Sequence, residues 1–83
     1  MATANRSIGF ILVKDYAALD QITCFCESKF IDFHTEIISR NTVVKGRFHV
    51  HVFSIESLKK LSTFISTVNL NAIVVNQIHE IEN

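Results

Sequence analysis

The stretch that decides the fold reads Arg47-Phe48-His49-Val50-His51-Val52-Phe53. Its β-branched and aromatic residues are typical of a β-strand with one buried face. Because successive side chains of a strand point to opposite faces, one face would carry Phe48, Val50 and Val52, and the other His49, His51 and Phe53. We predict that this stretch is the central strand of a sheet. Gly46 just before it favours a tight reversal of the chain at Lys45-Gly46.

The residues before this stretch predict a strand, a helix and a second strand. Residues 8–13 are an apolar run too short for a helix. Asp15 can cap a helix over residues 16–30. One face of that helix would carry the apolar residues that recur at three- and four-residue steps, namely Leu19, Ile22, Cys26 and Phe30. Residues 33–44 then resemble a strand interrupted at Arg40-Asn41, where the chain could alternatively reverse.

The residues after the central stretch predict a second helix and a last strand. Ser54 can cap a helix, and Glu56 in its first turn suits the helix dipole. The apolar face of this helix would consist of Ile55, Leu58, Leu61, Phe64, Ile65 and Val68. Asn69-Leu70-Asn71 ends the pattern. The tail, residues 72–81, favours a strand by residue type, although its apolar spacing also fits a helical face.

The resulting order of elements is β-α-β-β-α-β, which is two split β-α-β units. We therefore predict that residues 1–83 form a single α+β domain. It would be an open-faced sandwich, with a four-stranded antiparallel sheet and both helices on one face, as in ferredoxin-like folds.

The composition is apolar for so short a chain. Hydrophobic residues make up 48% of 83 residues, and the formal net charge is zero. This balance predicts that part of the apolar surface is covered by a second copy or by another protein. The charged residues are scattered and form no basic patch for phosphates, so we expect no nucleic acid partner. The longest apolar run, Phe10 to Val13, is too short to span a membrane, and with no signal-peptide pattern we expect a cytoplasmic location.

The sequence contains no recognisable catalytic signature. It has no nucleophile elbow, no evident pair of carboxylates and no glycine-rich phosphate loop, so we expect no enzymatic activity and no cofactor. Cys24 and Cys26 are expected to be reduced thiols, one packed in the core and the other partly exposed.

Two histidines of the central stretch are the strongest candidates for binding. His49 and His51 share one face and could reach one metal ion, and His34 on the neighbouring strand could supply a further donor. Our preferred interpretation is that both rings face solvent on the open side of the sheet. A metal or small-ligand sensor using these histidines is the alternative.

The segment from Ser28 to Leu58 resembles the HPr-like phosphocarrier proteins of the bacterial sugar phosphotransferase system. The similar residues are Ser28-Lys29-Phe30, Ile38-Ser39, Val43-Val44 and Phe53-Ser54-Ile55. The resemblance implies a related fold in which the tail is a helix. Tyr16 stands where that family has its phosphorylated histidine, Ala18 where it has an arginine, and Phe48 where it has a regulatory serine. The resemblance therefore implies a degenerate relative that has lost phosphotransfer.

Taken together, these patterns predict a non-enzymatic domain that acts by contact with a protein partner or a second copy. We expect the contact surface to be the sheet face carrying His49, His51 and Phe53, or an exposed strand edge.

Overall fold

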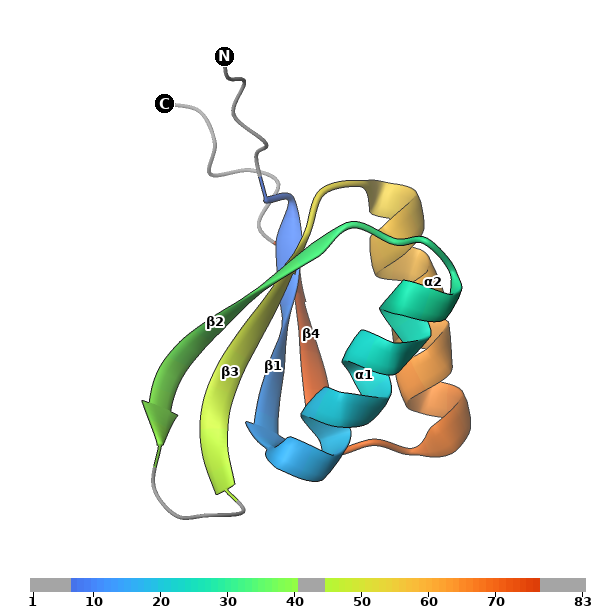
Figure 1. Cartoon of the computed structure of the whole chain (residues 1–83). Helices are drawn as coiled ribbons and strands as arrows, with labels where there is room; N and C mark the ends of the chain where they lie inside the picture. Colours follow the sequence, from blue (N-terminus) through green and yellow to red (C-terminus); the bar gives the residue numbers. More distant parts are fainter. Residues whose placement is uncertain (1–6, 41–44, 77–83) are drawn as a thin grey trace.

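The structure is a computed structural model that describes residues 7–40 and 45–76. Its elements are β1 (Gly9–Asp15), α1 (Tyr16–Ser28), β2 (Phe33–Arg40), β3 (Lys45–Val52), α2 (Ile55–Val68) and β4 (Ala72–Asn76). The four strands form one antiparallel sheet in the order β2-β3-β1-β4 (Figure 1). This confirms the predicted α+β class, the predicted order of elements and the interior position of β3.

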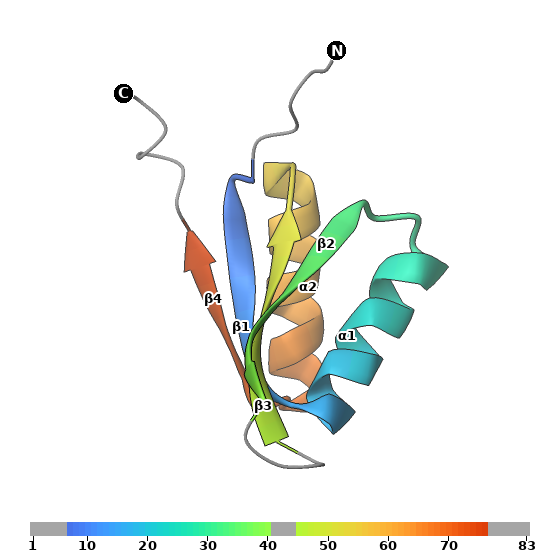
Figure 2. The same cartoon turned by 60° about the vertical axis from the view of Figure 1, so that its left-hand side comes forward.

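Both helices lie against the same face of the sheet (Figure 1, Figure 2), and no described element covers the other face. The core lies between the two layers and follows the predicted alternation, because Phe48, Val50 and Val52 are at most 1% exposed. Ile11 and Val13 of β1 join them from the neighbouring strand. The helices contribute Ala18, Ile22, Cys26, Leu58, Leu61 and Ile65. Neither α1 nor α2 has the length and apolar character that crossing a membrane requires.

Both predicted helix caps are confirmed. The Asp15 carboxylate accepts a hydrogen bond of 2.7 Å from the amide of Ala18, and the Ser54 hydroxyl accepts one of 3.1 Å from the amide of Ser57. Each bond satisfies an amide that the first helical turn leaves without an intrahelical partner. These caps fix where each helix leaves the sheet.

The predicted end of the first helix is wrong. α1 ends at Ser28, and Phe30 lies beyond it in a left-handed conformation with 94% of its surface exposed. Ile31, which is 7% exposed, packs against the core in its place. The apolar spacing extends to residue 30, but the helix ends two residues earlier, and the side chain of Phe30 is exposed rather than packed with the other apolar residues.

The predicted tight turn at Lys45-Gly46 is also wrong. Both residues belong to β3, where Gly46 pairs with Arg40 and has no positive φ. The absence of a side chain is needed there for a different reason. A Cβ on Gly46 would lie 2.8 Å from the carbonyl oxygen of Ser39 and 3.0 Å from the Phe48 ring. The connection between the two strands falls at residues 41–44, outside the described residues.

The second helix and the tail follow the prediction with smaller differences. Leu58, Leu61 and Ile65 are buried, whereas Ile55 and Val68 at the two ends of α2 are 51% and 43% exposed. The helix ends at Asn69 in a left-handed conformation. The tail is a strand over Ala72–Asn76, and residues 77–81 lie outside the described part.

Candidate functional site

The open face of the sheet divides into a polar half and an apolar half. On the polar side, His49 of β3 is paired with Glu36 of β2, and His51 is paired with His34. On the apolar side, each histidine is followed across the sheet by one residue of β1 and one of β4. Leu12 and Ile73 follow His49, and Phe10 and Val75 follow His51. The histidines therefore lie along the boundary between the two halves.

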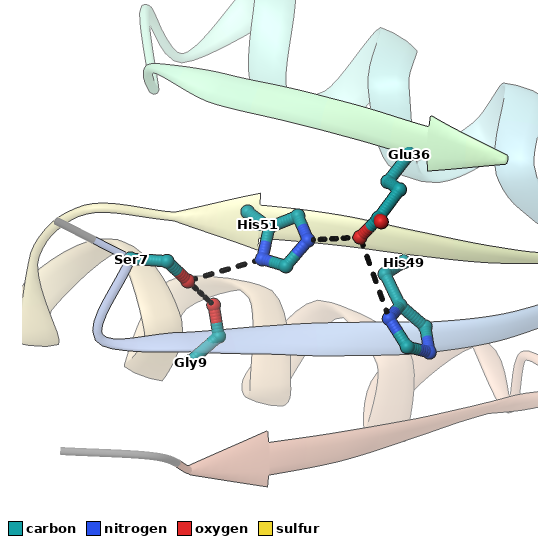
Figure 3. A network of polar contacts seen from close by, with 5 residues as sticks. All are labelled: Ser7, Gly9, Glu36, His49 and His51. Carbon is teal, nitrogen blue, oxygen red and sulfur yellow. Dashed lines mark hydrogen bonds and ion pairs between the residues drawn. The ribbon is translucent and has the colours of Figure 1, made fainter. Parts of the chain in front are cut away.

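His51 is held at both ring nitrogens (Figure 3). Its Nε2 lies 2.9 Å from Glu36 Oε1, and its Nδ1 lies 3.1 Å from the hydroxyl oxygen of Ser7. That hydroxyl donates its only proton to the carbonyl oxygen of Gly9 at 2.9 Å. It must therefore accept from His51, which places a proton on Nδ1 and directs Nε2 at the carboxylate.

His49 reaches the same carboxylate oxygen from another direction. Its Nδ1 lies 3.8 Å from Glu36 Oε1 (Figure 3). The His49 ring also stacks on the ring of Phe10, with centroids 4.1 Å apart. The His49 side chain is 25% exposed. Desolvation lowers the pKa of His49 below 6.5, the attraction of Glu36 partly opposes this, and His51 lowers the pKa further. The neutral ring is therefore favoured at pH 7.

Glu36 stays ionised. The hydrogen bond from His51 is the largest cause that lowers the pKa of the Glu36 carboxyl. Desolvation, the next largest cause, opposes it, and the charges of His51, His49 and His34 lower the pKa further. One carboxylate oxygen and two imidazole nitrogens thus converge, with the three ligand atoms all within 4.8 Å of one another. Two imidazoles and a carboxylate form a donor set that suits a divalent transition metal.

The structure brings together only part of the predicted site. His49 and His51 share the open face as predicted, and the ring of His34 lies 6.3 Å from that of His51. Phe53 follows the end of β3 and lines a shallow hollow beside His51, away from Glu36.

The two cysteines lie as predicted, because Cys24 is exposed and Cys26 is buried in the core. Burial raises the pKa of the Cys26 thiol to about 11, with a smaller effect from Glu27.

Glu36 is the residue that the sequence interpretation missed. The alternation of His34 and Glu36 along a predicted strand was a sufficient signal that both share a face. What the pattern lacked was the register that sets Glu36 opposite His49.

Comparisons of the chain with protein-family models, curated proteins and solved structures found no match. The resemblance to HPr-like phosphocarriers therefore stays a prediction from the residues.

Proposed function

We propose that this chain is a non-enzymatic interaction domain that pairs with a second copy of itself through the open face of its sheet. The observation that carries the proposal is the apolar strip formed on that face by Phe10, Leu12, Ile73 and Val75. No described element covers the strip, in which Ile73 is 50% exposed and Leu12 and Val75 are partly exposed. Phe10, which stacks against the His49 ring, is 9% exposed.

A second copy suits this surface for two reasons. A two-fold axis through the strip would set each apolar residue against the same strip of the partner, because an isologous interface uses one patch twice. The chain has a formal net charge of zero, so two copies experience little long-range repulsion. The histidines would then lie at the polar rim of the interface, where interfaces are usually hydrated.

Sedimentation equilibrium of the full chain, over a wide concentration range and with EDTA present, tests this proposal. We expect a reversible species of twice the 9.4 kDa chain mass. Ile73→Lys places a charge in the strip and should leave only the monomer. Ile55→Lys is the matched control, because Ile55 is 51% exposed but lies on α2 in the other layer.

Circular dichroism confirms that both variants are folded before their masses are compared. The proposal is overturned if the wild-type chain stays monomeric throughout, since the strip then needs no copy. It is also overturned if Ile73→Lys dimerises as strongly as Ile55→Lys, because pairing would then use a strand edge or the helical layer.

A further inference from the structure

We infer that Glu36, His49 and His51 form a binding site for one divalent transition-metal ion, with zinc as the representative ion. The site lies within a single chain and so does not depend on the proposed dimer. It uses His49 Nδ1, His51 Nε2 and a carboxylate oxygen of Glu36 (Figure 3).

The spacing of the donor atoms fits a tetrahedral ion. Ligands bound to zinc at their usual distances lie roughly 3.4 Å from one another. Here Glu36 Oε1 is 2.9 Å from His51 Nε2 and 3.8 Å from His49 Nδ1, so these two spacings lie on either side of that value. All three ligand atoms lie within 4.8 Å of one another.

The hydrogen bonds of Ser7 supply the second reason. Because its hydroxyl proton goes to the carbonyl of Gly9, Ser7 fixes the proton of His51 on Nδ1. The Nε2 of His51 points at a carboxylate oxygen 2.9 Å away, and the hydrogen-bonding proton between these two atoms occupies the place that a metal cation would take. A histidine whose other nitrogen is already held by a hydrogen bond is the usual arrangement around a bound metal.

The scaffold supplies the third reason. Both histidines are on β3, an interior strand, and Glu36 is on the neighbouring strand at a paired position. Phe10 supports the His49 ring by stacking, which limits its orientations. Donors that are fixed in place lose little conformational freedom on binding. The Glu36 side chain is 52% exposed, so the fourth position of a tetrahedral ion would be accessible to water.

Calorimetric titration of the full chain with zinc chloride at pH 7.5 tests the site. We expect one zinc per chain and at least about tenfold weaker binding in Glu36→Gln, His49→Gln and His51→Gln. Ser7→Ala retains all three ligands but loses the hydrogen bond that orients His51, so its affinity should fall about 10- to 100-fold. Magnesium should give no heat, because that ion prefers an all-oxygen shell.

Two matched controls remove donors of similar kind outside the cluster. His34→Gln deletes another imidazole of the open face, and Cys24→Ser deletes the exposed thiol. Both variants should keep the wild-type affinity for zinc.

A spectroscopic measurement on the wild-type chain is independent of any folding defect in the variants. In nitrogen-15 spectra of the imidazole rings, zinc should shift His49 Nδ1 and His51 Nε2 most strongly.

The inference is overturned if the wild-type chain gives no heat with zinc, or if Glu36→Gln and His51→Gln bind zinc as tightly as the wild type. Loss of binding in His34→Gln or Cys24→Ser would assign the ion to other ligands and would equally overturn it.

Discussion

Replacing Phe30 by glycine should stabilise this protein. Phe30 follows α1 with a φ of 56°, in the left-handed region that bulky residues avoid. The amide of Ile31 donates to the carbonyl of Cys26 at 2.9 Å, and the amide of Phe30 donates to that of Glu27 at 3.3 Å. This is the Schellman arrangement, in which glycine usually occupies the left-handed position. The Phe30 side chain is 94% exposed, so its removal forfeits little burial.

The magnitude follows from two opposing effects. A left-handed conformation costs an L-residue about 1–2 kcal/mol, and glycine removes that cost. Glycine also gives the unfolded chain more freedom, which costs about 0.5–1 kcal/mol. The net gain in the free energy of unfolding should lie between about 0 and 1.5 kcal/mol, with a central value of about 0.75 kcal/mol. In a domain of this size, that central gain raises the melting temperature by about 3–6 °C.

Urea denaturation followed by circular dichroism, at one protein concentration and with EDTA, measures this gain. Phe30→Ala is the control, because it removes the same exposed ring but keeps the Cβ that causes the strain. It should change the free energy of unfolding by less than about 0.5 kcal/mol. Asn69→Gly should gain less than Phe30→Gly, because asparagine accepts the left-handed φ of 57° more readily.

The reasoning is refuted if Phe30→Ala stabilises the protein as much as Phe30→Gly, because the gain would then come from loss of the ring. A destabilised Phe30→Gly would refute it more directly, since the ring would have to contribute more stability than the strain costs.

Three further outcomes are expected. Gly46→Ala should lower the free energy of unfolding by about 1–3 kcal/mol, because its Cβ would meet the backbone carbonyl of Ser39. An unchanged urea midpoint would contradict this expectation. Burial lowers the pKa of His49 below 6.5, so the stability from its neutral ring is complete above pH 6.5 and is lost as the pH falls through the lowered value. Its proton NMR titration with EDTA should have a midpoint below 6.5, and a higher midpoint would be inconsistent with burial. Iodoacetamide should modify Cys24 in the folded protein and reach Cys26 only in urea, as mass spectrometry would show.

Patterns that depend on near neighbours in the chain were readable from the sequence. The alternation of residues 47–53 correctly assigned Phe48 and Val50 to the core and His49 and His51 to the open face. The caps of both helices were equally readable, because a capping side chain bonds an amide only three residues ahead.

The end of the first helix and the position of the turn before β3 were predicted less well. Phe30 fits the apolar spacing of the helix, and nothing in that spacing shows that α1 ends at Ser28. Gly46 has the residue type of a turn, but it lies in β3, where the carbonyl of Ser39 and the Phe48 ring leave no room for a side chain. Backbone hydrogen bonds at Phe30 and Ile31 close α1, and a contact with the neighbouring strand explains the glycine at position 46.

The sequence by itself determined that His49 and His51 share a face, because side-chain alternation is a property of one strand. Only the tertiary structure decided that Glu36 stands between them, since a shift of one residue in the pairing of β2 with β3 would turn its carboxylate to the opposite face. The same packing brought Ser7 to the far side of the His51 ring, 44 positions away in the chain. Register is set by contacts between strands, and these become fixed only when both strands pack on a common core.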